Sequence, residues 1–595
     1  MVLLFHHTWL LTSSSLEMDE TSMYLLLEKK GEDCVYTKDG SLDYHNNPAN
    51  KLKTGRWKAC IFIVATASLE RLAYFGMSSN LLLYFKLELN QHSATASRNL
   101  SNWTGACYIA PLLGAFVADG YIGKFWTIAC SSVLYAIGMT LLTASALAPR
   151  LFKTDVTEAT DSQTVACFTA LYLVAMASGG VKACISAYGA DQFDDNDKAE
   201  KKLKSSFFNW YYQMMNIGSL IAHSLIVWVQ DNVGWDWGFG IPTLAMVMGV
   251  VSFFSGTWFY RNHKPGGSPL TSLFQVVVAS LRKKRINMQT DASLLYEIAD
   301  ANSSTTGSRQ LNHTRNLSFF DKAAVETASD REKGSINPWR LCTVTQVEEL
   351  KAVIRLLPIW FTGIIFSSVR GQVDNLFVLQ GSFMDTQIDN SSFIIPPASL
   401  GTIGTLSVIF WVPVYDQIIV PLARKLTGHP NGLTQLQRMG IGHSILVFSM
   451  LAAGILEVIR LDFVERHNYY DIKPVPISIF WQVPQFFIVG CAEVFTLVGQ
   501  MEFFYEQVPD SMRSFGSALR LTTIALGSYM SSLLVTIVTE VTTEDGGPGW
   551  IPDNLNYGKL QNFFWLLAVL SVLNLGIFVV VAKWHASKRS VEMIM

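Results

Sequence analysis

Ionisable side chains occur inside long apolar stretches of this sequence, where charges are unusual. Glu70 and Arg71 lie in the middle of the first stretch, Lys182 lies in the fourth and Glu493 in the tenth. An unpaired charge in hydrocarbon costs roughly 3 kcal/mol or more, so such residues are functional candidates by default. Arg71, Lys182 and Glu70 together carry a charge of +1. A central cavity containing them would favour a carboxylate or another anion.

Each of these charges also has a structural interpretation. We expect Lys182 to face Glu70 across the half, with Arg71 left to meet an anion; the structural alternative is a static ion pair that only fixes helix packing. Glu493 could bind a proton or an ammonium group, or it could be a protonated structural residue. Glu70 and Arg71 are adjacent and point about 100° apart on a helix, so we expect each to find partners on other helices.

A second pair of charges, Arg370 and Asp374, is separated by four residues in the seventh stretch. Side chains at this spacing are neighbours on a helix, so the two can pair locally near the outer mouth. A role in substrate binding is the alternative. Tyr74 and other aromatic residues in the stretches could line a cavity or simply pack.

The elements that must position these residues are membrane helices. Of the 595 residues only 15% are charged, against roughly 25% in soluble domains. Apolar runs of about 20 residues, each able to cross about 30 Å of hydrocarbon, recur along the chain. The predicted spans are 57–85, 101–121, 125–148, 164–188, 206–229, 237–260, 348–379, 399–423, 439–459, 477–505, 515–541 and 562–583. This pattern argues against a soluble enzyme, a fibrous protein or a disordered chain.

The spans fall into two sets of six. The predicted parts are a cytosolic N-terminal segment (1–56), a six-helix half (57–260), a polar cytosolic linker with some helix (261–347), a second six-helix half (348–583) and a cytosolic tail (584–595). This all-α layout of twelve transmembrane helices is that of the major facilitator fold. Lysines cluster in the loop after the fourth span, and the linker is basic, so both termini and the linker are expected in the cytosol.

A short polar motif, GAFVADGYIGK, follows the second span. Gly114 and Gly123 would permit close helix approach and a tight turn, while Asp119 and Lys124 can pair across the helix ends. Asp416, followed by basic residues after the eighth span, is a degenerate echo that supports duplicated halves. An ordinary polar turn is the alternative.

Motifs of other functions are not found. The sequence has no P-loop, HExxH, G-x-S-x-G or CxxC pattern, so we expect no enzyme activity, metal site or cofactor. A net charge of −2 gives no global basic field for nucleic acid. The first residues lack the basic region of a signal peptide, and translation could start at Met1 or Met18. Asn390 is a possible glycosylation site on the outer side.

Specific stretches resemble the proton-dependent oligopeptide transporters, and in particular the plant nitrate/peptide transporter family. The match runs from about residue 56 to 583, and the peptide-transporting subfamily is the most similar. The stretches are LERLAYFGMSSNLL (69–82), GAFVADGYIGKFWTI (114–128), GGVKACISAYGADQFD (179–194), FFNWYYQMMNIGSL (207–220), TVTQVEELKAVIRLLPIW (343–360), IPPASLGTIGTLSVIFWVPVYD (395–416), TGHPNGLTQLQRMGIG (427–442), AEVFTLVGQMEFFYEQVPDSMRS (492–514) and PGWIPDNLN (548–556).

The resemblance implies roles for individual residues. Arg71 and Lys182 would receive the carboxylate of a peptide, Asn216 and Glu493 its amino terminus, and Tyr74 would line the pocket. The proton would be the coupling ion, carried by Glu70 or Glu493, with no other cofactor.

Three positions depart from the family pattern. Ala67 stands where a glutamate is expected, Arg370 where the peptide subfamily commonly has tyrosine, and Gly404 where relatives have aspartate or asparagine. These changes predict a more basic cavity and an altered proton path.

The resulting expectation is proton-coupled symport of di- or tripeptides by alternating access. A carrier of nitrate or another small organic anion, with weakened coupling, is the first alternative, and a non-transporting membrane sensor is the second. We expect a monomer in the plasma or vacuolar membrane.

Overall fold

The computed structural model describes residues 36–594, apart from 38, 152–160, 195–196, 264–268, 286–294, 298–312, 315, 328–336, 388–393, 428–431, 509–512 and 544–546. Asn390 lies outside the described residues. The N-terminal half contains α2 (Arg56–Ser78), α3 (Leu81–Leu87), α4 (Ser93–Val117), η2 (Ala118–Ile122), α5 (Gly123–Leu151), α6 (Asp161–Ala190), α7 (Lys198–Ile221), η3 (Ala222–Ile226), α8 (Val227–Asn232), α9 (Trp235–Ser255) and η4 (Thr257–Phe259).

The C-terminal half follows a linker that contains α10 (Pro269–Arg282) and η7 (Ser318–Ala324). Its elements are α12 (Val344–Gly371), η8 (Val373–Phe377), α13 (Val378–Gly381), β1 (Met384–Asp385), η9 (Pro397–Leu400), α14 (Gly401–Val414), η10 (Tyr415–Ile419), α15 (Val420–Thr427), α16 (Gln435–His467), β2 (Val475–Ser478), η11 (Ile479–Gln482), α17 (Val483–Glu506), α18 (Arg513–Thr543), η13 (Leu555–Tyr557) and α19 (Leu560–Ile594).

Each of the twelve predicted spans corresponds to a helix or to a helix continued by short turns. Ten stretches of the described chain are long and apolar enough to cross a membrane. One of these, Ser93–Leu147, contains both α4 and α5, and α7 with α8 is not among the ten. The chain is therefore a multi-pass membrane protein with two six-helix halves.

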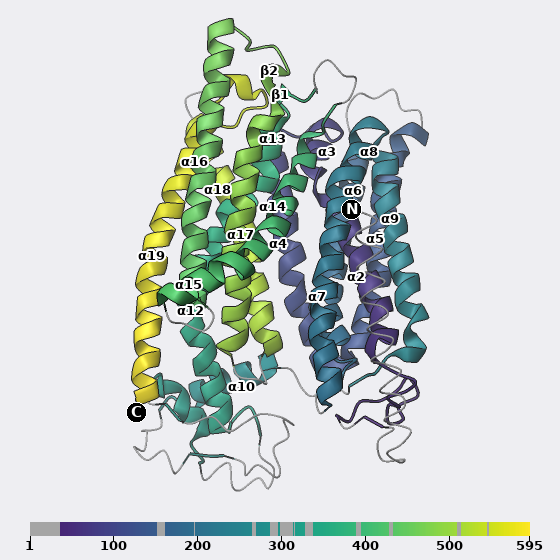
Figure 1. Cartoon of the computed structure of the whole chain (residues 1–595), viewed down its shortest axis with the longest axis vertical. Coiled ribbons are helices and arrows are strands. Elements are labelled where there is room, and N and C mark those ends of the chain that lie inside the picture. The colour runs from purple at the N-terminus through teal and green to yellow at the C-terminus, as the bar shows by residue number, and fades with distance from the viewer. Residues whose placement is uncertain are drawn as a thin grey trace.

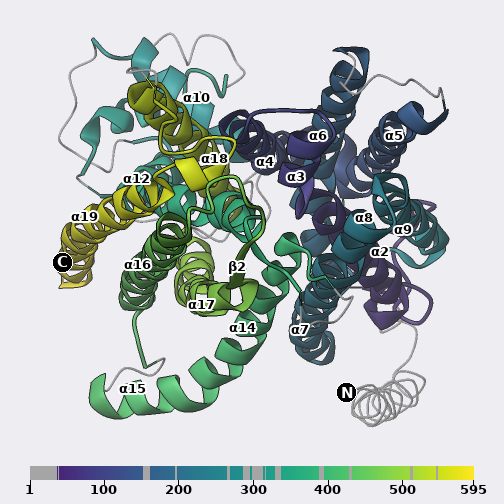
Figure 2. The same cartoon turned by 90° about the horizontal axis from the view of Figure 1, so that it is seen from above.

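The two halves stand side by side, with the C-terminal half on the left of Figure 1 and the N-terminal half on the right. Along their length α4 packs against α18, and α7 meets α14, as the view in Figure 2 also shows. At the end that carries the parallel strands β1 and β2, α3 touches α13 and α8 touches η9. We call this end the strand end; the C-terminus lies at the opposite end (Figure 1).

The loop before α19 reinforces contact between the halves at the strand end. Asp553 Oδ1 accepts a hydrogen bond from the Ser93 backbone N–H at 2.9 Å, and its Oδ2 lies 2.5 Å from His92 Nδ1. Lys86 Nζ donates to the Asp553 carbonyl at 2.9 Å. Because Lys86, His92 and Ser93 belong to the N-terminal half, Asp553 ties the two halves together.

Local sequence explains several of these elements. Capping boxes, in which a threonine pairs with a glutamine three residues later, begin α12 at Thr343 and α16 at Thr434. Gly114 brings α4 against α6: a Cβ there would lie 2.7 Å from the Gly179 carbonyl oxygen. Gly123 has φ 79°, which a residue with a side chain rarely adopts. The predicted close approach and tight turn are both confirmed.

The linker is more compact than its composition predicts. Leu273 and Val276 of α10 join Ala323 and Ala324 of η7 in an apolar cluster with the first turns of α12. The buried Lys351 of α12 also forms ion pairs with Asp321 at 2.6 Å and Glu348 at 2.7 Å. The described part of the linker is therefore packed onto the C-terminal half instead of being solvated throughout.

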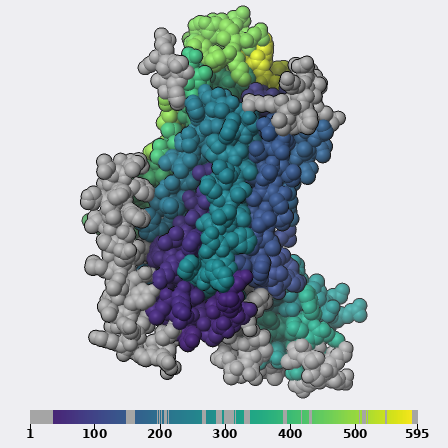
Figure 3. Space-filling model, turned by 90° about the vertical axis from the view of Figure 1, so that its right-hand side faces the viewer, coloured from purple at the N-terminus to yellow at the C-terminus, as the bar shows by residue number. Residues whose placement is uncertain are grey.

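The helix surfaces away from the other half are apolar. On the face that Figure 3 shows, α9 runs beside its neighbours in the N-terminal half. It exposes Leu244, Val247, Met248, Val251 and Phe254. A surface of this kind suits contact with lipid chains.

Candidate substrate pocket

A pocket of about 380 Å³ lies between the two halves. The N-terminal half contributes residues of α2, α4, α7 and η3, and the C-terminal half contributes residues of α12, η8, α14, α17 and α18. Five of the six predicted substrate-binding residues are among those that line it: Arg71, Tyr74, Asn216, Arg370 and Glu493. The sixth, Lys182, is not.

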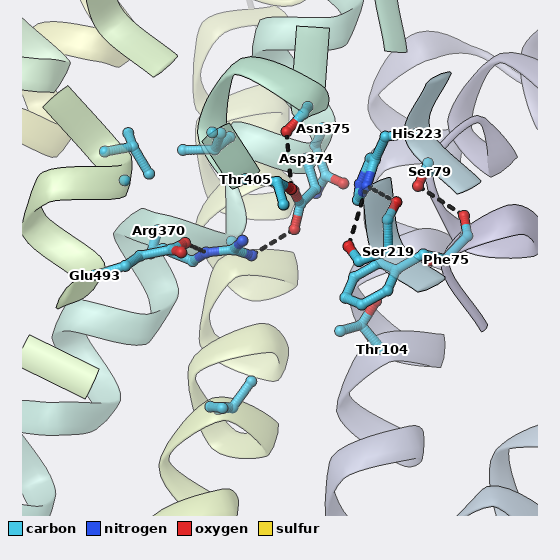
Figure 4. A pocket seen from close by; sticks show the side chains of 18 of the residues that line it. Phe75, Ser79, Thr104, Ser219, His223, Arg370, Asp374, Asn375, Thr405 and Glu493 are labelled. Atoms are coloured by element: carbon cyan, nitrogen blue, oxygen red, sulfur yellow. Dashed lines mark hydrogen bonds and ion pairs between the residues drawn. The ribbon is translucent and has the colours of Figure 1, made fainter. Parts of the chain in front are cut away.

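On the C-terminal side, Arg370 is held between two carboxylates (Figure 4). Its Nε donates to Glu493 Oε1 at 2.6 Å, which links α12 to α17. Its Nη1 donates to Asp374 Oδ2 at 2.5 Å. The predicted local pair of Arg370 and Asp374 is confirmed. Glu493 is not a free carboxylate, however, because the guanidinium already occupies it.

On the N-terminal side, Arg71 faces the pocket while Glu70 is buried behind it. The two adjacent side chains are 21% and 4% exposed, and their closest N–O distance is 3.7 Å. The two therefore form a loose ion pair with each other, which differs from the prediction that each finds partners on other helices. Glu70 Oε1 makes no hydrogen bond within the described structure.

Lys182 does not face Glu70, contrary to the sequence-based expectation. Its Nζ lies 3.5 Å from the centre of the Tyr74 ring and 5.0 Å from that of Tyr108. The amine is buried and has no hydrogen-bond partner among the described residues. The cation is held instead by the negative faces of two aromatic rings, a contact worth about 2 kcal/mol when desolvated. Tyr74 therefore separates Lys182 from the pocket.

The polar motif after α4 also pairs differently from expectation. Lys124 Nζ forms its ion pair with Asp191, at 2.7 Å, and no ion pair with Asp119 is present in the described structure. Asp191 follows α6, so the contact joins the start of α5 to the end of α6. The motif fixes three neighbouring helices through its glycines and this pair.

The structure gives different surroundings to two departures from the family pattern. Ala67 is only 2% exposed and packs in an apolar cluster with Ala118, Ile128 and Val181, away from the pocket. Gly404 lines the pocket, and a Cβ there would meet nothing within 4 Å. The missing side chain at 404 therefore enlarges the pocket.

Comparison with known proteins identifies the family. A family model described as PTR2, POT family, matches residues 125–551. The chain belongs to the POT family. The Arabidopsis thaliana proteins NRT1/PTR FAMILY 8.1 and 8.2 are 56% and 58% identical to it over 562 and 561 residues. These matches cover 94% and 93% of this chain and 98% of each relative.

Solved structures of POT family proteins share the fold. The crystal structure of the POT family transporter PepTSo has a TM-score of 0.67 at 21% identity, and covers 89% of this chain and 98% of that one. An auto-inhibited POT family peptide transporter has a TM-score of 0.64 at 22% identity, with 88% and 96% covered. As a POT family member, the chain is a proton-coupled transporter and not an enzyme.

Sequence reasoning did not single out His223, which lines the pocket of this POT family member opposite Asp374 (Figure 4). Its signal was present: it is a lone histidine in the apolar run LIAHSLIVWV. Asp374 was predicted as a partner for Arg370, with a role in substrate binding as the alternative. His223 lies on the π-helical turn η3 and Asp374 on the π-helical turn η8. Such turns within α-helices are frequently found at functional sites.

Proposed function

We propose that this chain carries di- or tripeptides together with protons by alternating access of the central pocket. The observation that carries the proposal is the arrangement of charge across the pocket. Arg71 lines it from the N-terminal half, while Glu493 and Asp374 line it from the C-terminal half. A peptide with charged ends is a zwitterion, and opposite charges on facing walls suit its two ends.

The roles of the residues follow from this arrangement. Arg71 receives the carboxylate, and Lys182 supports it from behind the ring of Tyr74. Asn216 and Glu493 receive the amino group, which competes with Arg370 for the Glu493 carboxylate. Recognition of the peptide ends leaves the side chains free and gives broad selectivity.

Proton coupling is assigned to Glu70 and Glu493, with the proton as the coupling ion and no other cofactor. Protonation of either acid would weaken its hold on the neighbouring arginine and free that cation to bind or release substrate. We place both termini and the linker in the cytosol, and the protein in the plasma or vacuolar membrane as a monomer.

A second cargo, nitrate or another small organic anion, is favoured by one specific observation. Arg370 already neutralises Glu493 at 2.6 Å, so no substrate amine is needed there. An anion bound at Arg71 would then need no accompanying substrate amine, and proton coupling would be weakened.

Uptake into proteoliposomes tests the proposal. Labelled dipeptide is supplied with an inward proton gradient, and unlabelled dipeptides, nitrate and organic acids are added as competitors. Gradient-dependent dipeptide uptake that is blocked by other dipeptides supports the peptide cargo. Competition by nitrate or organic acids alone would favour the anion cargo. Uptake that is independent of external pH and unchanged by Glu70→Gln and Glu493→Gln would reject the coupled mechanism.

A further inference from the structure

His223 stands where the two halves meet inside the pocket. It belongs to η3 of the N-terminal half and lines the pocket. A Cβ added to Gly401 of α14 would lie 2.6 Å from His223 Cδ2 and 3.2 Å from Nε2. The edge of the ring that carries Nε2 therefore lies against the backbone of the C-terminal half. Rocking of the halves must change the surroundings of this edge.

The other ring nitrogen is fixed within the N-terminal half. His223 Nδ1 lies 2.8 Å from the Ser219 carbonyl oxygen, one helical turn away. A carbonyl oxygen only accepts hydrogen bonds, so Nδ1 carries a hydrogen. The proton that the imidazole can gain or lose is therefore on Nε2. Among the described residues nothing hydrogen-bonds to Nε2, which leaves its lone pair available.

The groups around His223 can respond to a charge on the ring. Asp374 and Arg370, both of the C-terminal half, are the charged groups that act on it electrostatically. The ring of Phe75 from α2 packs at 5.1 Å, and Gly401 supplies only backbone. A proton on Nε2 would place a cation near the Asp374 carboxylate, which at present is bound to Arg370.

We propose that His223 is a proton-binding residue of the transport cycle, which takes up a proton at Nε2 and thereby links the N-terminal half to Asp374. The inference rests on the proposed coupling of transport to protons, and not on the identity of the cargo. The protonated ring draws Asp374 away from Arg370 and favours contact between the halves at this point. Loss of the proton returns Asp374 to Arg370 and releases the contact.

Another histidine of the same chain serves as a matched control. His443 of α16 also places Nδ1 2.8 Å from a carbonyl oxygen four residues earlier, that of Met439. Its ring is enclosed by Phe366 and Phe578, with centroids 4.9 and 4.7 Å away, and it does not line the pocket. His443 thus has the same backbone contact but lies outside the pocket lining.

The test compares His223→Gln and His443→Gln in proteoliposomes. Two rates are measured with a cargo that the wild type carries: exchange of substrate at equal pH on both sides, and uptake driven by a proton gradient over a range of pH. Imidazole ordinarily titrates near neutrality and carboxylates near pH 4, so the upper pH limit of driven uptake should move by about 1 to 2 units toward acid in His223→Gln. Exchange should be retained, and His443→Gln should keep the wild-type profile.

Three outcomes would overturn the inference. The first is a wild-type pH profile in His223→Gln. The second is the same shift in His443→Gln. The third is loss of exchange together with driven uptake in a variant that melts like the wild type, which would make His223 a substrate contact. Failure of the peptide proposal would appear in the wild type itself, as exchange of anions but not dipeptides, whereas failure of this inference appears only in the difference between variants.

Discussion

Removing the guanidinium of Arg370 would return two carboxylates to the pocket. The Arg370 side chain binds Glu493 at 2.6 Å and Asp374 at 2.5 Å. Methionine has similar reach and no charge, so Arg370→Met deletes both contacts with little loss of volume. An ammonium group that enters the pocket then no longer competes with a tethered cation for Glu493. We expect the variant to bind peptides with a free amino terminus more tightly.

The size of the gain follows from the contact that becomes available. A hydrogen bond to a charged group contributes about 1.5–3 kcal/mol, and each 1.4 kcal/mol corresponds to about tenfold in affinity. The half-saturating concentration for a free-amine dipeptide should therefore fall about 10-fold to 100-fold. Arg370 is 34% exposed, so water weakens these contacts, and the lower end of the range is expected.

The assay compares a dipeptide with its N-acetyl form as competitors of labelled dipeptide uptake. The acetyl group removes the positive charge and keeps the rest of the substrate, so only the free-amine form should bind more tightly to Arg370→Met than to the wild type. Arg370→Lys keeps a cation and should show a smaller gain, and the gain should vanish when Glu493→Gln is added. An equal change in the affinity of both competitors, or no change in either, would refute the assignment of Glu493 to the amino terminus.

Three further changes test other parts of the structure. Ala67→Glu places a carboxylate in an apolar cluster at a site that is 2% exposed, so overpacking alone should cost about 1–3 kcal/mol. The melting temperature should fall more than it does in Ala67→Met; an unchanged melting temperature together with a steeper pH dependence of uptake would contradict this. Lys351→Met removes the lysine that pairs with the buried carboxylates of Asp321 and Glu348 and should destabilise by about 3–5 kcal/mol. Arg466→Met removes an exposed pair and should change the melting temperature little; equal effects of the two variants would show that the linker contact contributes nothing. Burial acts to raise the pKa of Asp553, but the His92 ring and the Ser93 N–H outweigh it and hold that pKa below its ordinary value of 3.8. The stabilising contribution is present above that value and is lost as pH falls through the lowered one. Asp553→Asn should therefore reduce the melting temperature at neutral pH and down to about pH 4, with the difference disappearing only below it; a difference that vanishes well above pH 4 would contradict this.

The helices could be predicted from the sequence because the hydrocarbon sets their length. An apolar run of about 20 residues has few alternatives to a membrane helix, and each such run is helical here. Helix ends were less predictable. α16 continues to His467 although its apolar part ends earlier, since residues beyond the membrane surface can remain helical when they are polar. The packing of the linker was missed because a few apolar residues in a polar segment suffice to cover one helix turn.

Charged residues were predictable as candidates but not as pairs. The hydropathy pattern alone identifies a charged residue within an apolar run, whereas the ion-pair partner of that residue depends on which helices are neighbours. Arg370 and Glu493 are 123 residues apart, and Lys124 and Asp191 are 67 apart. Only the local pair of Arg370 and Asp374 followed from helical spacing. The aromatic surroundings of Lys182 were not predictable either, because Tyr74 lies on a different helix.

The net charge around the pocket differs from the +1 that Arg71, Lys182 and Glu70 of the N-terminal half carry together. The ionised side chains that line the pocket or lie directly behind its described wall are three basic and three acidic groups, which sum to zero: Arg71, Lys182, Arg370, Glu70, Asp374 and Glu493. A zwitterion leaves such a pocket neutral, whereas a lone anion leaves an uncompensated charge unless a proton accompanies it. A zwitterion carried with one proton moves one positive charge, to which the membrane potential contributes about 2.3 kcal/mol per 100 mV. An anion carried with one proton moves none. The neutral pocket therefore favours the cargo for which both the potential and the pH gradient can drive uptake.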